Sequence, residues 1–245
     1  MKQRATIVAI ALIVLALSIL VLAPMIYALP TAPSITNIST STAAGGLSNR
    51  STDAKGTITT MNLSANQQNF KWKAYVGNVT GTVALDDANG RTIYDWNLAS
   101  AGGQGEVYVS RSTSINWANI TCANDTSVIN EQNALGLSTS TLDSINLTIN
   151  RTNHASFIAS TTNLSGCRST ATYVNDSAQT MSATALFQEI LLMDAGNTSH
   201  IVYATLMQSA TTGYHSDHLF NFQLIVAENE SATVPTNYYF WVELG

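Results

Sequence analysis

Apolar residues recur at every second position in several short stretches of the chain after residue 69. The clearest alternations are Phe70, Trp72, Ala74 and Val76; Tyr94, Trp96 and Leu98; Ile201, Tyr203 and Met207; Phe220, Phe222, Leu224 and Val226; and Tyr238, Phe240, Val242 and Leu244. A period of two is typical of strands with one buried face. The pattern predicts an all-β domain over residues 69–245, an antiparallel β-sandwich that is immunoglobulin-like or jelly-roll-like.

Turn-forming residues between the alternating stretches predict how the strands connect. Gly77-Asn78 and Asn89-Gly90 separate the first runs, and they predict an antiparallel meander of four strands from Phe70 to Arg111. A short helix is expected over Ser127–Leu137. We expect further strands over Leu142–Ile149 and Ala155–Ala159.

The N-terminus follows a different pattern, because residues 5–29 form an almost unbroken apolar run. From Ala5 to Ala23 only Thr6 and Ser18 are polar, and a helix of that length spans roughly 30 Å, the thickness of a bilayer's hydrocarbon core. Length favours a retained transmembrane anchor over residues 1–29. Pro24 and the small residue Ala28 are instead typical of a signal peptide that is cleaved, and both interpretations stay open.

Basic residues around the apolar run predict its orientation. Lys2 and Arg4 precede the run, and the next basic residue is Arg50, so the N-terminus would stay inside and the rest of the chain would lie outside. A type IV pilin leader is a weaker interpretation, since the glycine before its cleavage site and the glutamate after it are missing. The predicted location is the cell surface or, after cleavage, the extracellular medium.

Residues 30–68 lack a sustained hydrophobic period and are rich in Thr, Ser, Ala, Asn and Gly. Such a segment buries too little apolar surface to offset the entropy lost on ordering. We expect a flexible stalk here, with one edge strand as an alternative within Thr57–Leu63.

Charge limits the kinds of partner. Charged residues make up 10% of the chain, and the part after residue 29 holds 8 basic and 15 acidic residues, a net charge of 8 − 15 = −7. It contains no basic run, which argues against nucleic acid as a partner. The expected partners are the membrane, through an uncleaved N-terminal helix, and other surface proteins, glycans or copies of the same chain.

Sequons for N-glycosylation are more frequent than chance predicts. The chain has 22 Asn and 56 Ser plus Thr among 245 residues, so about five sequons are expected at random. Twelve occur, and the predicted glycosylation sites are Asn37, Asn49, Asn62, Asn78, Asn119, Asn124, Asn146, Asn150, Asn163, Asn175, Asn197 and Asn229. The alternative is accidental accumulation in a chain rich in these residues. Without glycans, the solubility of the chain would depend on its neutral polar side chains.

Cys122 and Cys167 are the only two cysteines. Outside the cell an isolated pair most often forms a disulfide, which is the prediction here. The alternative is two free buried thiols, because sequence alone does not fix their separation.

Candidate catalytic and metal-binding residues are few. His215, Asp217 and His218 form the one histidine cluster, yet a polar turn explains them better than a metal site does, since two ligands rarely hold a metal. Asp87 and Asn89, with Asp86 beside them, are oxygen ligands that suit calcium, but Asn89-Gly90 is typical of a hairpin turn. Neither catalytic residues, nor a cofactor, nor a bound metal is predicted.

Four tryptophans offer surfaces that could stack on sugar, namely Trp72, Trp96, Trp117 and Trp241. All four lie in strand patterns, where packing in the core or on a sheet face is the default expectation. No Gly-x-Ser-x-Gly nucleophile motif or phosphate-binding loop occurs in the sequence.

Three segments resemble parts of uncharacterised exported, β-rich cell-surface proteins of archaea. They are Lys73–Gly81, Gly105–Tyr108 and Tyr238–Leu244. The resemblance implies an archaeal cell-surface location and brings no assigned activity and no functional residues.

Taken together, the sequence predicts a non-enzymatic cell-surface glycoprotein, anchored or secreted, with a structural, adhesion or recognition role. The alternative is a subunit of an extracellular filament or surface array, in which Thr57–Leu63 would add a strand to the next subunit's sheet. A secreted hydrolase is a third and weaker hypothesis.

Overall fold

The computed structural model describes residues 29–43, 55–56, 58–62, 67–97, 105–229, 231 and 233–245. Every strand pair within them is antiparallel, and strands far outnumber helices, which confirms the all-β prediction. In chain order the elements are β1 (Trp72–Gly77), β2 (Thr82–Asp86), β3 (Thr92–Asn97), β4 (Gly105–Ser110), the 3-10 turn η2 (Trp117–Asn119), β5 (Ile120–Cys122), α2 (Asp125–Ala134), α3 (Ile145–Thr148), β6 (Phe157–Ala159), β7 (Thr162–Leu164), β8 (Ser169–Ala171), β9 (Gln188–Asp194), β10 (Asn197–Leu206), β11 (Thr211–Thr212), β12 (Leu219–Phe220), β13 (Phe222–Ala227) and β14 (Tyr239–Leu244).

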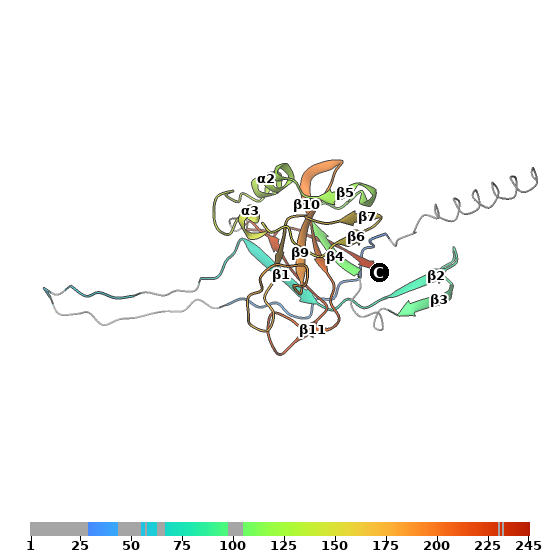
Figure 1. Cartoon of the computed structure of the whole chain (residues 1–245), viewed down its shortest axis with the longest axis horizontal. Coiled ribbons are helices and arrows are strands. Elements are labelled where there is room, and N and C mark those ends of the chain that lie inside the picture. Colours follow the sequence, from blue (N-terminus) through green and yellow to red (C-terminus); the bar gives the residue numbers. More distant parts are fainter. Residues whose placement is uncertain are drawn as a thin grey trace, which may run out of the picture.

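A six-stranded sheet lies at the centre of the molecule (Figure 1). Its strand order is β14-β4-β10-β9-β5, and β8 also pairs with β9. All seven residues of β9 are buried, so both faces of the sheet are covered. The predicted alternation along β10 therefore sorts side chains between two cores instead of between core and water, and the residues of β9 are divided in the same way.

The first core lies on the face that carries Leu191, Tyr203 and Val242. It is covered by the two-stranded sheet β1–β13, which contributes Leu224 and Val226, and by α2 and α3. Helix α2 begins where the Asn124 side chain accepts a hydrogen bond from the Ser127 amide at 2.8 Å.

The second core lies on the opposite face, around Tyr108, Ile190 and Val202. The short hairpin β6–β7 covers it with Phe157 and Leu164. Side chains that are one residue apart on β9, such as Ile190 and Leu191, thus belong to different cores, as the period of two requires.

Several predicted elements occur where expected. The helix expected over Ser127–Leu137 is α2, and the alternations near the C-terminus correspond to β10, β13 and β14. The residues of the last alternation, from Tyr238 to Leu244, all pack in or against the first core. The strand expected over Ala155–Ala159 is β6.

Two predictions about local structure are wrong. The four-stranded meander does not form, because β1 pairs with β13, β2 pairs with β3, and β4 lies between β10 and β14. The strand expected over Leu142–Ile149 is instead helix α3. Ile145 and Ile149 are both fully buried, and their spacing of four places them on one helical face, while Leu142 is 90% exposed.

Strand β1 also faces the core with residues that the alternation assigned to solvent. Tyr75 packs against the first core, with its ring 5.0 Å from that of Phe240, whereas Ala74 is exposed. Lys73 is half-buried and forms an ion pair with Glu228 beside the Tyr238 ring. Its long aliphatic chain covers apolar surface while the charge is neutralised, which explains how a lysine fits on the inner face.

The first residues of the expected stalk lie on the central sheet. Pro30 is buried, and Thr31 exchanges two backbone hydrogen bonds with Val242 at 2.9 and 2.8 Å. Residues 29–43 then run along the molecule, drawn in blue in Figure 1, and residues 58–62 lie well away from the sheets. In the described part of the chain no helix has the length and hydropathy needed to cross a bilayer, and the predicted anchor over residues 1–29 lies outside that part except for Leu29.

Candidate functional site: an aromatic hollow and an apolar hairpin

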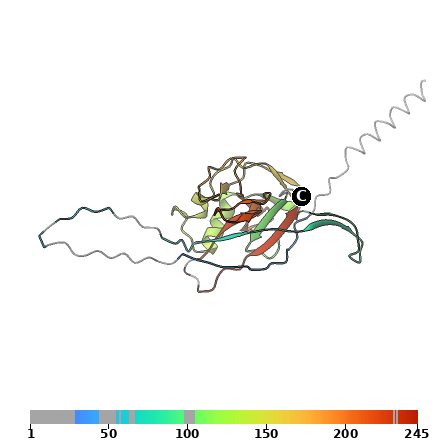
Figure 2. The same ribbon diagram turned by 90° about the horizontal axis from the view of Figure 1, so that it is seen from below.

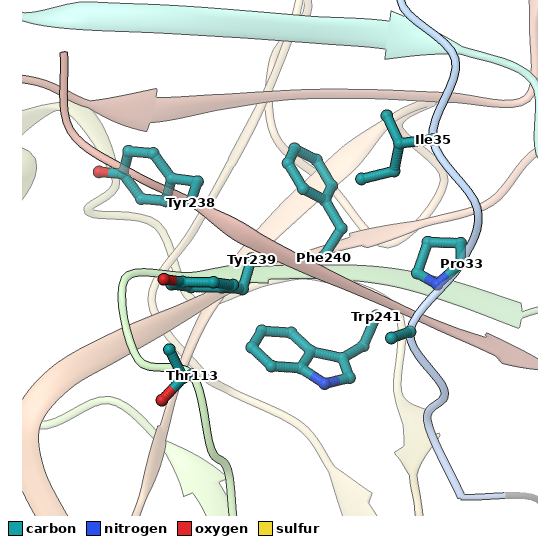
Figure 3. A pocket seen from close by; sticks show the side chains of 8 residues that line it. Pro33, Ile35, Thr113, Tyr238, Tyr239, Phe240 and Trp241 are labelled. Atoms are coloured by element: carbon teal, nitrogen blue, oxygen red, sulfur yellow. The ribbon is translucent and has the colours of Figure 1, made fainter.

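A shallow hollow of about 260 Å³ opens between the N-terminal segment and β14 (Figure 3). It follows from the pairing of Thr31 with Val242, which holds the next residues beside the last strand. The lining residues are Ala32, Pro33, Ile35, Thr113, Tyr238, Tyr239, Phe240 and Trp241.

Aromatic contacts behind the hollow fix the position of its floor. The Trp241 ring lies 5.8 Å from that of Trp117, which in turn lies 4.9 Å from the Tyr108 ring. Trp117 and Trp241 are both partly buried against the second core, as predicted, although Trp117 lies in the 3-10 turn η2 and not in a strand. Figure 3 shows Pro33 and Ile35 on the opposite side of the hollow from Tyr239.

The side chains of the hollow suit binding by contact instead of acid-base chemistry. They are aliphatic or aromatic, with hydroxyl groups only from Thr113 and the tyrosines. Tyr239 is 40% exposed, so its ring is available for stacking. A volume near the lower end of ligand pockets fits one sugar ring or one or two peptide side chains.

A second candidate surface is the hairpin β2–β3, which projects away from the sheets (Figures 1 and 2). The register pairs Val83 with Trp96 and Leu85 with Tyr94, so these four side chains share one face. Leu85, Tyr94 and Trp96 are 56, 60 and 55% exposed. Trp96 therefore departs from the default expectation of core packing, and contiguous exposed apolar residues of this kind mark an interaction surface.

The hairpin turn accounts for the acidic residues that resembled a calcium loop. The Asp87 carboxylate accepts hydrogen bonds from the amides of Asn89 and Arg91 at 2.8 and 2.9 Å, and Gly90 has a φ of +73°. Both bonds lower the pKa of Asp87, and the bond from the Arg91 amide has the larger effect. The turn interpretation of Asp86, Asp87 and Asn89 is confirmed.

The histidine cluster also lies in a turn, between β11 and β12. His215 contacts Asp176 with an Nδ1–Oδ1 distance of 3.2 Å, and His218 hydrogen-bonds to its neighbour Asp217. Among the described residues no group of three or more His, Cys, Asp or Glu side chains is arranged to hold a metal ion.

Two glutamates face each other within the second core. Glu106 on β4 is paired with Glu243 on β14 in the sheet register, and both are buried. Burial, and then the neighbouring Glu243, raise the pKa of Glu106 to about 8, while burial raises that of Glu243. The Glu243 carboxylate accepts hydrogen bonds from Tyr108 Oη at 2.8 Å and from the Ser160 amide at 2.9 Å. Glu243 thus fastens the β6–β7 turn to the sheet.

A third buried carboxyl group lies on the opposite face of the sheet. Glu189 on β9 is fully buried, and one of its oxygens accepts a hydrogen bond from the Ile225 amide at 2.9 Å. Burial raises the pKa of Glu189 to about 8. It is therefore neutral at neutral pH, which removes the large cost of an unpaired charge in the core.

The predicted glycosylation sites lie at the surface wherever the structure describes them. Nine of the sequon asparagines are exposed, namely Asn37, Asn62, Asn78, Asn119, Asn124, Asn150, Asn163, Asn175 and Asn197. Asn146 and Asn229 are half-buried, and Asn49 lies outside the described residues. Exposure is a requirement for glycosylation, which itself stays a prediction.

Cys122 and Cys167 form a disulfide with a Cα–Cα distance of 5.0 Å. This confirms the predicted pairing and excludes the free thiols. Cys122 ends β5 at the edge of the central sheet, and Cys167 is buried in the second core. The disulfide therefore joins the sheet to the loop that follows β7.

Sequence reasoning missed the aromatic hollow, the glutamate pair and the contact of Thr31 with the sheet. The hollow and the Thr31 contact depend on a pairing between residues at opposite ends of the chain, and no local pattern signals such a pairing. The two glutamates could have been noticed in the sequence, since Glu106 and Glu243 each interrupt a strand made mainly of apolar or aromatic residues.

Comparisons with protein-family models, with curated proteins and with solved structures gave no match to this chain. The resemblance to archaeal exported proteins therefore stays a prediction, and the functional argument depends on the residues of this chain alone.

Proposed function

We propose that this protein is a cell-surface glycoprotein with a structural, adhesion or recognition role, held at the membrane by residues 1–29 or released after their cleavage. The single observation that carries the proposal is the exposure of nine sequon asparagines in a chain whose two cysteines are paired. Paired cysteines are typical of oxidising compartments, and accessible sequons suit an exported chain.

The proposed architecture is a β-sandwich. The sheet β1–β13 packs across one face of the central sheet, with Leu224 and Val226 in the same core as Leu191 and Tyr203. Two antiparallel sheets that share a core are the basis of this fold class. Helices α2 and α3 complete the cover of that face.

Recognition, in this proposal, uses the aromatic hollow. Tyr239 and Trp241 supply stacking surfaces, and Thr113 supplies a hydroxyl group beside them. Sugars and proline-rich peptides both bind such surfaces. The proposed protein is a binding protein instead of an enzyme, and the buried position of Glu106 and Glu243 supports a structural role for these acids.

The proposal is tested on the protein purified from the membranes of cells that export it. Mass spectrometry of its peptides should find glycan mass on exposed sequons such as Asn163 and Asn197. Asn89 and Asn116 are equally exposed but are not in sequons, so they are the matched controls and should carry none. Bare asparagines throughout, in protein recovered from the cytosol, would contradict the proposal.

N-terminal sequencing of the same sample separates the anchored and the released forms. A start near Leu29 indicates cleavage, and an intact Met1 or Lys2 indicates a retained anchor.

A second candidate function is a subunit of an extracellular filament or surface array. The observation that favours it is Ile58, which is fully exposed in the segment that lies away from the sheets. In this hypothesis Thr57–Leu63 adds a strand to a neighbouring copy, in the way that Thr31 bonds to the edge strand β14 within the chain. Electron microscopy of purified surface material would show regular filaments or lattices if it is right.

A further inference from the structure

We propose that the hairpin β2–β3 docks on a lipid surface, the same bilayer that holds the N-terminal anchor. The inference rests on the proposed function, and specifically on a retained anchor. The hairpin would lie along the interface with Val83, Leu85, Tyr94 and Trp96 against the lipid.

The composition of the two hairpin faces fits that position. The four apolar and aromatic side chains share one face, and the other carries Thr82, Ala84 and Asp95, with the exposed Ile93 at the register shift beside the turn. Tyrosine and tryptophan are the residues that concentrate at membrane interfaces, since each combines an apolar ring with a hydrogen-bonding group. The polar turn around Asp87 resists entry into hydrocarbon, so the hairpin would lie flat instead of crossing.

The position of the anchor explains why a bilayer is the partner. The apolar run ends at Leu29, and Thr31 is already hydrogen-bonded to Val242. Two residues span at most about 7 Å, so the anchor ends within that distance of β14. The domain would therefore be held against the membrane surface and not lifted from it by a stalk.

The hairpin starts from the same end of β14. A Cβ atom placed on Gly81, just before β2, would lie 3.1 Å from the Leu244 side chain. Figures 1 and 2 agree that the hairpin projects past the end of the molecule where the C-terminus lies. The anchor and the exposed apolar face thus leave the domain at neighbouring positions.

Charge defines the kind of lipid surface. The hairpin carries Asp86, Asp87 and Asp95 against Arg91, a net charge of 1 − 3 = −2. Electrostatic attraction to anionic lipid is therefore not available, and the contact would depend on apolar and aromatic burial. We expect binding to zwitterionic lipid that weakens as anionic lipid is added.

The test uses the full chain in phosphatidylcholine vesicles that contain brominated acyl chains, which quench tryptophan emission at short range. The chain has four tryptophans and none lies in the anchor, so Trp96→Phe isolates the hairpin signal. We expect strong quenching of wild type and a clear loss of the quenched component in Trp96→Phe.

Two further variants keep Trp96 as the reporter. Leu85→Asn places a polar group on the apolar face and should reduce the quenching of Trp96 at least twofold. Ala84→Asn makes a similar change on the opposite face and should leave it unaltered. Circular dichroism confirms that both variants fold.

The outcomes separate this inference from the function on which it rests. Chain that fails to float with the vesicles overturns the retained anchor, and with it the hairpin inference, and restricts the proposed function to the released form. Chain that floats, but shows equal quenching of wild type and Trp96→Phe, overturns the hairpin inference alone. Trp96 shielded from acrylamide but not quenched by lipid bromine would also overturn it, because the hairpin would then be covered by protein and not by lipid.

Discussion

The central sheet and the β2–β3 hairpin use strand sequences in opposite ways. Strand β9 carries two acids and a glutamine, yet all seven of its residues are buried. Strand β3 carries Ile93, Tyr94 and Trp96, and all three are exposed. The difference shows that burial in this protein follows from what covers a strand, and not from the hydrophobicity of the strand itself.

The two regions differ in how the free-energy cost of their unfavourably placed side chains is offset. Buried acids in the central sheet and in the helix that covers it have a raised pKa, as Glu189 on β9 has, or are paired, as Glu131 on α2 is with Arg111. In the hairpin, apolar groups stay in water until a partner covers them. The buried sheet thus contributes stability, and the hairpin leaves an apolar surface open to contact. The predictions below compare changes in the buried region with changes at exposed positions.

The largest expected effect is a fall in stability with rising pH. Between pH 4.5, the usual pKa of a glutamate, and a folded-state pKa of about 8, Glu189 is protonated in the folded chain and ionised in the unfolded chain. Stability therefore falls as the pH rises from 4.5 to 8, by on the order of 5 kcal/mol for a shift of this size, and levels off above 8. Urea unfolding at a series of pH values measures this slope.

Glu189→Gln should reduce that pH dependence, because the amide does not ionise, and Glu106, whose pKa burial also raises to about 8, should supply the slope that remains. Asp95→Asn, on the exposed face of β3, should leave it unchanged. Equal slopes in wild type and Glu189→Gln would show that Glu189 is not the titrating group.

Removal of the disulfide is the next largest change. The linked cysteines are 45 residues apart in sequence, and loop-closure entropy predicts a loss of about 4 kcal/mol for Cys122→Ala with Cys167→Ala. Denaturant unfolding measures the loss. The environment of Trp96 on the hairpin should be unchanged in the folded variant, since the disulfide acts on the sheet.

Two arginines test buried against exposed ion pairs. Arg111 bonds to the fully buried Glu131 at 2.7 and 2.9 Å, so Arg111→Met leaves an unpaired charge and should cost about 3–5 kcal/mol. Arg168 bonds to Asp125, which is 80% exposed, and Arg168→Met should cost less than about 1 kcal/mol. Similar losses in the two variants would contradict the burial argument.

The smallest expected change in stability is for a substitution in the hairpin, and two leucines, one buried and one exposed, allow the comparison. Leu191→Ala opens a cavity in the first core and should cost about 2–5 kcal/mol. Leu85→Ala removes an exposed side chain and should change stability by less than about 0.5 kcal/mol. A cost above 2 kcal/mol for Leu85→Ala would mean that the hairpin is already covered within the folded chain.

Much of the fold followed from local pattern. The period of two identified β10, β13 and β14 with the correct inner face, and the single cysteine pair predicted the disulfide. These predictions succeeded because alternation depends on residues close in sequence, and because two cysteines allow only one pairing.

Predictions failed where the structure depends on pairing between strands that are far apart in the sequence. The hairpin at Asn89-Gly90 was predictable, but nothing local indicates that β1 bonds to β13 or that β4 lies between β10 and β14. The same reason hides the aromatic hollow, which exists only because Pro33 is held beside Trp241. Helix α3 was missed because Ile145 and Ile149 fit both a strand and a helix in so short a run.

The position of β4 has a consequence for how the chain would fold during the proposed export. Strand β4 pairs with β10 and also with β14, and Thr31 bonds to β14 as well. If the strands cross the membrane in chain order, β14 follows the other described strands, so the central sheet would stay incomplete until β14 has crossed. Such high contact order favours slow folding, and export would then require that the waiting edge of β4 be shielded from neighbouring chains.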